Sequence, residues 1–189
     1  MMAMIKRQVK RSSPEVASLS SALPREFLDA DDGVTAVEFA LIAAPFFALL
    51  FAILETSLAF FAQQVLQTAT TESARLIMTG SAQTSGMTAA QFQQAVCNNA
   101  VALFTCGGVY VNVQKFSSFG SASQLNPLVA GNFNPALMNY NPGGPGDIVV
   151  VQVFYVWPVD IAPLGFSLSN MNGNNRLLVG TSVFKNEPY

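Results

Sequence analysis

The stretch that decides the fold opens Gly33-Val34-Thr35-Ala36-Val37-Glu38-Phe39-Ala40-Leu41-Ile42-Ala43-Ala44-Pro45, and every side chain from Phe39 to Leu54 is apolar. These sixteen residues give roughly 24 Å of helix, less than the roughly 30 Å of a hydrocarbon core. Adding the residues back to Val34 and on to Ala62 brings the stretch to spanning length. It therefore predicts one transmembrane helix at residues 34–62.

Glu38 is an acidic residue inside this predicted membrane helix, and its presence there needs an explanation. A charged side chain at the middle of a membrane helix costs about 2.5 to 3.5 kcal/mol on insertion scales, so an acid there is a functional candidate. Glu38 lies five residues after Gly33. The alternative is a carboxylate that reaches the headgroup layer of an ordinary membrane anchor.

Six residues of the opening carry a family resemblance: Gly33, Glu38, Phe39, Ala40, Leu41 and Pro45. They resemble the processing site of type IV pilin-like proteins and, more narrowly, the TadE/TadG-like pseudopilins of tight adherence (Flp-type) pilus systems. Residues 183–189 look like the closing strand of that family. The resemblance implies a pilin-like fold and cleavage after Gly33 by a prepilin peptidase. It also implies other pilins or pseudopilins, the inner-membrane pilus assembly platform and membrane lipid as partners.

Cleavage after Gly33 would free the amine of Val34 at the membrane edge. The resemblance implies that Glu38 of a neighbouring subunit pairs with this amine, with Phe39 in the same assembly contact. At about 4 Å and an effective dielectric constant near 20, the attraction is about 4 kcal/mol, which is comparable with the insertion cost of the acid. Such a pair would fix the axial offset between subunits.

Small residues recur at every fourth position of the helix, as Ala36, Ala40, Ala44, Ala48 and Ala52. Small side chains at this spacing let membrane helices approach closely, so they predict a packing ridge. The alternative is that alanine serves as an ordinary helix former. Pro45 removes one backbone hydrogen bond and predicts a kink. Glu55 is expected near the outer headgroups, either reaching the interface or contacting a partner.

Composition limits what the rest of the chain can be. The 189 residues leave room for one modest domain beside the helix. The chain is 51% hydrophobic and 11% charged, with a mean hydropathy of +0.38, which is too apolar for a disordered protein or an ordinary soluble enzyme. Its net charge is −2 and it has no histidine, so it offers no basic face for nucleic acid.

Most of the basic residues precede the helix: Lys6, Arg7, Lys10, Arg11 and Arg25. The positive-inside rule then places the N-terminus in the cytoplasm and the residues after about 62 outside. We predict a cleaved cytoplasmic leader at 1–33, a single span of the bacterial inner membrane at 34–62 and a periplasmic head at 63–189. Incorporation into a surface pilus stays open. A competing interpretation is a secretory signal cleaved after Ala59.

Two cysteines, Cys97 and Cys106, fall on the outer side of the membrane. An even pair in an oxidising compartment predicts a disulfide that closes a short loop. The alternative is two unpaired thiols. Zinc is not expected, because no histidine or second cysteine pair completes a set of four ligands.

The head is predicted to be α+β. The membrane helix is expected to run on to residue 79, dock through Val65, Leu66, Ala69 and Leu76, and end at Gly80. Thr88 and Gln91 fit a capping box for a second helix over 88–104. Three strand-like runs follow at 109–114, 148–157 and 177–184 and predict a three-stranded antiparallel sheet, with Gly180 weakening the last strand or marking a bulge.

Two segments read as irregular. Residues 117–146 contain four prolines and five glycines and predict a long loop, which either contacts a partner or fills space. Residues 170–175 have turn chemistry.

No catalytic constellation is present in the sequence. Without histidine there is no Ser-His or Cys-His pair, and no phosphate-binding Gly-x-x-x-x-Gly-Lys loop occurs. The acids of the predicted head are far apart: Glu72, Asp147, Asp160 and Glu187. We therefore predict neither an enzyme nor a cofactor or metal site.

These observations favour a minor pilin or pseudopilin that helps to assemble a tight adherence (type IVc-like) pilus or secretion system. The alternative is an unprocessed single-pass envelope protein whose outer domain binds a partner. A further possibility is a small-molecule or surface-binding module, which would need a defined pocket.

Overall fold

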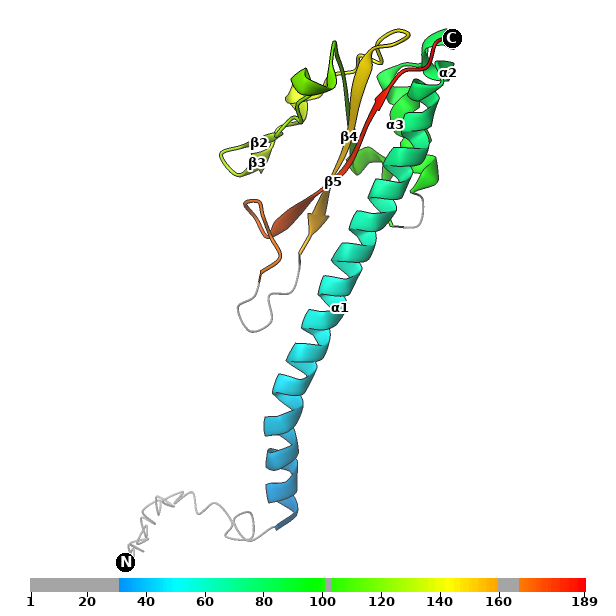
Figure 1. Cartoon of the computed structure of the whole chain (residues 1–189). Coiled ribbons are helices and arrows are strands. Elements are labelled where there is room, and N and C mark those ends of the chain that lie inside the picture. The colour runs from blue at the N-terminus through cyan, green and yellow to red at the C-terminus, as the bar shows by residue number, and fades with distance from the viewer. Residues whose placement is uncertain (1–30, 101–102, 160–166) are drawn as a thin grey trace, which may run out of the picture. The chain divides into compact units, whose positions relative to one another are not determined.

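The computed structural model of the protein describes residues 31–100, 103–159 and 167–189 (Figure 1). The chain divides into two compact units, Met1–Ala43 and Ala44–Tyr189. The described part of the first unit is the start of one long helix. The second unit contains the rest of that helix and an α+β head. Of the predicted leader only residues 31–33 are described, and Asp160 lies outside the described residues.

The elements follow one another as α1 (Asp31–Met78), α2 (Ser81–Thr84), α3 (Ala89–Asn99), η2 (Cys106–Gly108), β1 (Val109–Phe116), η3 (Phe119–Ser121), β2 (Leu128–Val129), β3 (Asn132–Phe133), η4 (Pro135–Leu137), β4 (Ile148–Pro158) and β5 (Asn175–Lys185). The predicted α+β class, with a long apolar helix, a further helix and a three-stranded antiparallel sheet, is confirmed. The helical turn α2 and the hairpin β2–β3 were not predicted.

Helix α1 continues through Pro45 and ends at Met78. Gly80 stops it with a φ of 77°, which is easy for a residue without a Cβ. The Gly80 N–H donates to the Ile77 carbonyl over 3.1 Å and so satisfies one of the last carbonyls of the helix. The predicted end of the helix is confirmed.

Helix α3 begins as predicted but ends early. The N–H of Thr88 donates to Gln91 Oε1 over 2.8 Å, and the Gln91 N–H donates to Thr88 Oγ1 over 3.3 Å, which completes the capping box. The helix stops at Asn99 instead of residue 104. The Ala100 N–H donates to the Cys97 carbonyl over 2.9 Å, a bond between residues three apart, and Ala100 has a φ of −119°, so the helix has ended at this residue.

The sheet has the order β1-β4-β5, with both pairs antiparallel. Val153 of the central strand lies opposite Val111 on β1 and Gly180 on β5, so these residues share one face. Residues 148–154 are buried, as expected of a central strand with both faces covered.

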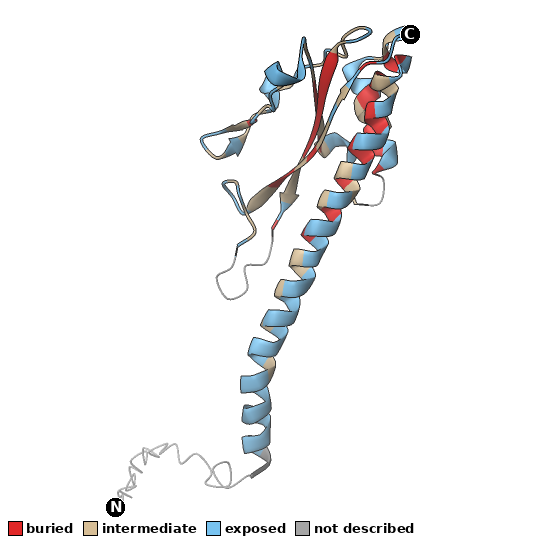
Figure 2. Ribbon diagram, viewed as in Figure 1, coloured by how far each residue is buried: buried red, intermediate tan, exposed pale blue. Residues whose placement is uncertain are grey.

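The two faces of the sheet have different covers. Val111, Val153 and Leu178 belong to one core cluster with Leu66 of α1 and Phe92 of α3, so the helices cover this face (Figure 2). The opposite face carries the segment 117–146.

That segment is more ordered than the predicted long loop. Two buried amides hold it on the sheet: the Leu125 N–H donates to Gln152 Oε1 over 2.8 Å, and the Asn139 N–H donates to Asn112 Oδ1 over 3.0 Å. Asn112 Nδ2 in turn donates to Gln152 Oε1 over 3.3 Å. The predicted turn at 170–175 is present, with Gly173 at a φ of 75°.

Candidate functional site: helix α1 and the sheet edge

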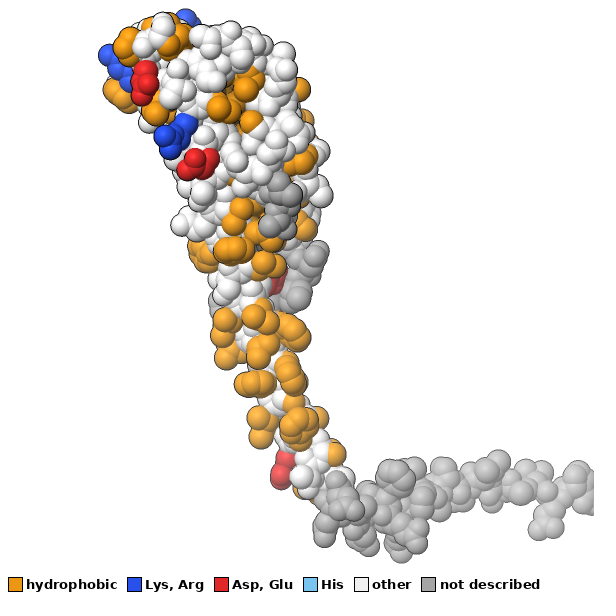
Figure 3. Space-filling model, turned by 90° about the vertical axis from the view of Figure 1, so that its right-hand side faces the viewer, with side chains coloured by type: hydrophobic (Ala, Val, Ile, Leu, Met, Phe, Trp, Pro, Cys, Tyr) orange, Lys and Arg blue, Asp and Glu red, His pale blue; other side chains and the backbone are white. Residues whose placement is uncertain are grey.

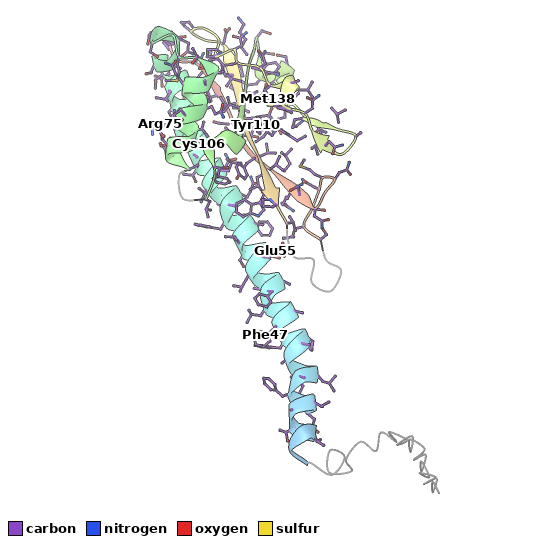
Figure 4. The ribbon with its side chains drawn as sticks, turned by 180° about the vertical axis from the view of Figure 1, so that it is seen from behind. Phe47, Glu55, Arg75, Cys106, Tyr110 and Met138 are labelled. Carbon is purple, nitrogen blue, oxygen red and sulfur yellow. A yellow bond between two sulfur atoms is a disulfide. The ribbon has the colours of Figure 1, made fainter. Side chains whose placement is uncertain are left out.

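Up to Phe61, α1 is mostly apolar and mostly uncovered. Figure 3 shows hydrophobic side chains around this part of the helix, and Phe47 projects from it well apart from the head (Figure 4). The most apolar window of the helix has no buried residue and is long and apolar enough to cross a membrane. A large apolar surface that none of the described residues covers is typical of a site for lipid or a protein partner.

The residues predicted to direct processing and assembly all lie on this surface. Gly33, Val34 and Glu38 are exposed, and Phe39 is 70% exposed. The bond between Gly33 and Val34 lies inside α1, which begins at Asp31 instead of Val34. Cleavage after Gly33 and pairing of Glu38 stay predictions.

The alanine row lies along the same part of the helix. The first three members are exposed and the last two are half-buried: Ala36, Ala40, Ala44, Ala48 and Ala52. Glu55, further along, is half-buried. Close packing of a neighbouring helix on the row, and a kink at Pro45, stay predictions.

Beyond Ala62, α1 packs on the head along a face slightly rotated from the predicted one. Leu66 and Ala69 are buried as predicted, whereas Val65 and Leu76 are only half-buried and Ile77 is fully buried. Ser73 is also buried, and Asn99 Nδ2 of α3 donates to its hydroxyl over 3.1 Å. The predicted stripe already allowed one polar break at Glu72 or Ser73, and the structure places Ser73 and Ile77 inside the interface instead of Glu72 and Leu76.

Two glutamines of α1 cover the backbone of the edge strand β5. Gln63 Nε2 donates to the Val179 carbonyl over 2.8 Å, and the Val179 N–H donates back to Gln63 Oε1 over 3.4 Å. Gln67 makes the same pair of bonds with Thr181, at 2.9 and 3.0 Å. Outward-facing groups of an edge strand are a template for pairing with another chain, and here the two side chains occupy them.

The spacing of this contact follows from the rise per residue of a helix and that of a strand. Four residues of helix advance about 6.0 Å and two residues of strand about 6.6 Å, so glutamines four apart meet strand residues two apart. Sequence reasoning missed this role. The available signal was Gln63 and Gln67 on one helix face, directly after the apolar stretch.

Further contacts cover other edge positions. On β5, the Leu177 N–H donates to Asn170 Oδ1 over 2.7 Å. On the opposite edge of the sheet, Gln93 Nε2 of α3 donates to the Val109 carbonyl over 2.7 Å, and the chain at Asn139 and Asn141 bonds both backbone groups of Val113. Amide side chains and a return of the chain therefore occupy both edges at these positions.

Gly180 lets α1 approach β5. It was expected to weaken the strand or mark a bulge, but β5 pairs continuously with β4 on both sides of it. A Cβ at Gly180 would collide with Thr70 Oγ1 and would lie 3.0 Å from the Leu66 carbonyl oxygen. The glycine thus marks a close approach of another backbone.

Cys97 and Cys106 form a disulfide, with 5.5 Å between their Cα atoms. Cys97 is buried at the end of α3, and Cys106 is exposed in η2 (Figure 4). The predicted pairing is confirmed. It fixes the connection from α3 to β1 beside the helix-covered face of the sheet.

The clearest electrostatic feature of the described head is a surface pair. Asp147 Oδ2 accepts from the Gly144 N–H over 2.9 Å and lies 3.5 Å from Lys115 Nζ. The hydrogen bond from Gly144, aided by the charge of Lys115, holds the pKa of Asp147 below its usual value despite partial desolvation. In the described residues, no three His, Cys, Asp or Glu side chains come together as a metal site.

Comparison with known proteins gives one finding. Residues 33–75 match the family model of the TadE-like proteins. The match begins at the glycine predicted for processing, and it confirms the resemblance found in the sequence to a TadE-like protein of Tad pilus systems. It covers most of α1 and none of the sheet. No curated protein and no solved structure matches the chain.

The TadE-like segment, residues 33–75, therefore contains the uncovered part of α1 and the two glutamines that cover β5. The long apolar helix fits a single-pass membrane protein of a pilus system.

Proposed function

We propose that the protein is a minor pilin or pseudopilin, which a prepilin peptidase processes after Gly33 and which assembles with other pilins at an inner-membrane platform. The observation that carries the proposal is the uncovered apolar part of the TadE-like segment, which holds an acid five residues after its first glycine. After cleavage, Glu38 of one subunit would meet the Val34 amine of the next. Residues 34–62 would cross the membrane and 63–189 would form the periplasmic head.

The covered edges of the sheet support a division of labour. A head with open strand edges could associate by strand addition. Gln63 and Gln67 occupy the backbone groups of Val179 and Thr181 on the β5 edge, which disfavours strand addition there, and the alanine row supplies a close-packing surface for assembly through the helix. The mature chain is much larger than the small major pilins of such systems, which favours a minor or priming role.

Substitution of Glu38 tests the assembly role. Glu38→Ala removes the carboxylate and is expected to reduce co-purification with other pilins, whereas Glu38→Asp keeps the charge and should retain part of it. Glu72→Ala is the matched control, because Glu72 is an exposed acid on the covered half of the same helix. Unchanged incorporation of Glu38→Ala would refute the pairing.

One observation favours a second candidate, an unprocessed single-pass envelope protein whose head binds a partner. The Gly33–Val34 bond lies within α1, so a peptidase would have to unwind the helix start before cutting. Mass spectrometry of protein extracted from its native membrane decides between the two. A mature terminus at Val34 supports processing, and an intact leader supports the envelope protein.

A further inference from the structure

One end of the head, which carries Trp157, Leu168 and Arg176, lies beside the last turn of the proposed membrane span. Ala59 is buried, and with Phe60 and Gln63 it lines a small cavity whose other wall is Leu168 and Arg176 of the head. The head therefore begins to cover α1 before the span, which we place at 34–62, has ended.

The same turn stays apolar where the head does not cover it. Leu58, Phe60 and Phe61 are 47%, 60% and 58% exposed. Apolar side chains for lipid and the first contacts of the head thus occur at one level of the helix. If the span ends at Ala62, this end of the head cannot stand clear of the headgroup layer.

A tryptophan and an arginine lie side by side at this end. Trp157 is opposite Arg176 in the β4–β5 register, so the two side chains leave the same face of the sheet. Both are half-buried. Arg176 Nη1 donates to the Leu168 carbonyl over 3.0 Å, and the guanidinium carries further N–H donors beyond this bond.

We propose that this end of the head rests in the phospholipid headgroups of the outer leaflet, with Trp157 at the level of the aromatic belt and Arg176 bound to a lipid phosphate. Tryptophan favours the membrane interface because its ring is amphipathic, and a guanidinium matches phosphate geometry. The occupant is argued from continuity, since the contact extends the uncovered apolar surface of α1. The inference rests on the proposed span, and it adds that the head is seated on the bilayer instead of being held away from it.

Trp157 is the only tryptophan of the chain, which makes it a depth probe. The full chain is reconstituted in phosphatidylcholine–phosphatidylglycerol vesicles carrying a spin label at the headgroup or deep in the acyl chain. We expect Trp157 to lose more emission to the headgroup label than to the deep label.

Two single-tryptophan controls separate this inference from the span itself. Trp157→Phe with Phe47→Trp reports the span and should be quenched most by the deep label. Trp157→Phe with Phe119→Trp reports the opposite end of the sheet, because Phe119 follows the end of β1 and is 60% exposed. Only a water-soluble quencher should reach it.

The outcomes are distinct. If the deep label quenches Phe47→Trp but no lipid label quenches Trp157, the proposed contact of the head with the headgroups is wrong and the proposed membrane span stands. Trp157 packs on Phe104 and Tyr155 of its own head, so protection of its ring from lipid and aqueous quenchers alike would indicate cover by these rings or by a second copy, and it also overturns the proposal. If neither lipid label quenches Phe47→Trp, both the proposed membrane span and the proposed headgroup contact are wrong.

The arginine is tested in the same vesicles. Arg176→Gln should reduce the loss of Trp157 emission to the headgroup label, and Arg176→Lys should keep most of it. A Gln variant quenched as fully as the parent shows that no phosphate contact seats the head, and refutes the proposal in this form.

Discussion

The two halves of α1 differ both in their side chains and in what surrounds them. Between Ala44 and Phe61 the helix leaves most of its phenylalanines and leucines exposed, whereas from Ala62 to Met78 one face is buried against the sheet and α3. The covered half has apolar residues on one face and polar residues on the others, whereas Phe39 to Leu54 is apolar on every face. The second half buries its apolar face within its own chain. The first half leaves its apolar surface exposed, as expected of a surface that contacts a membrane or another subunit.

The polar residues enforce this division. In the covered half, glutamine and serine side chains bond the head, as Gln67 does with Thr181 and Ser73 with Asn99. In the uncovered half, Phe39 to Leu54 contains no side chain that could hydrogen-bond a partner. Such a surface associates through apolar packing and small residues.

The largest expected effect comes from removing core volume in the covered half. Leu66→Ala should destabilise the head by about 2 to 5 kcal/mol, because Leu66 is fully buried in the core cluster. Leu49→Ala in the uncovered half should change it by no more than about 0.5 kcal/mol. Denaturant unfolding in detergent micelles, followed by Trp157 emission, measures both. Equal losses would show that the two halves do not differ.

Breaking the disulfide should have the next largest effect. Cys97 and Cys106 are nine residues apart, and a loop of that size is worth about 2 to 3 kcal/mol in the chain-entropy account. Cys97→Ser with Cys106→Ser should lower unfolding stability by this amount, and a reducing agent should do the same to the parent only. A reducing agent that also destabilises the double variant would contradict this origin.

How far the sequence predicts this fold depends on whether a signal is local. The apolar stretch, the Thr88–Gln91 capping box and Gly80 act within a turn or two, and each is confirmed where it was expected. The first strand also follows from local alternation, and the central strand follows from a nearly continuous apolar run. The membrane span, the cleavage and the role of Glu38 remain predictions, because they need a bilayer, a peptidase and a second subunit.

Two misses have a physical explanation. The second helix ends at Asn99 because Ala100 leaves the helical conformation, and no glycine or proline near that position signals the end in the sequence. Gly180 was judged by strand propensity, but its role depends on a helix more than a hundred residues earlier in the chain. The pairing of Gln63 and Gln67 with β5 was missed for the same reason.

Gly180→Ala tests how closely the covered half approaches the sheet. The added methyl group would meet Thr70 and the Leu66 carbonyl, so we expect a loss of about 1 to 3 kcal/mol. Adding Thr70→Ala should recover part of it, because it removes the nearer obstacle. Gly107→Ala is the control, since nothing lies within 4 Å of a Cβ there. Purely additive losses in the double variant would rule out the contact.

The glutamines should contribute less to stability than the core does. Gln67→Ala removes the two hydrogen bonds with Thr181 and should cost about 1 to 2 kcal/mol, whereas Gln64→Ala, an exposed neighbour, should be close to neutral. The double variant Gln63→Ala with Gln67→Ala should also promote association that rises with concentration, measurable by light scattering in detergent. A double variant as monodisperse as the parent would argue against a protective role for the edge.

The smallest expected effect is electrostatic and concerns the head alone. The pKa of Asp147 is lowered chiefly by the Gly144 N–H, so this carboxylate stabilises the fold when ionised. That contribution is complete above the ordinary aspartate pKa and is lost as the pH falls from there through the lowered value. Asp147→Asn should therefore weaken the head near neutral pH and flatten its acid dependence. Because Asp147 and Lys115 are partly exposed, added salt should reduce only the part of this stabilisation that comes from Lys115.

The helicity of the uncovered half serves as the control and is followed by far-ultraviolet circular dichroism in the same titration. It should not respond to Asp147→Asn. A response would show that the stability of the uncovered half is coupled to that of the head.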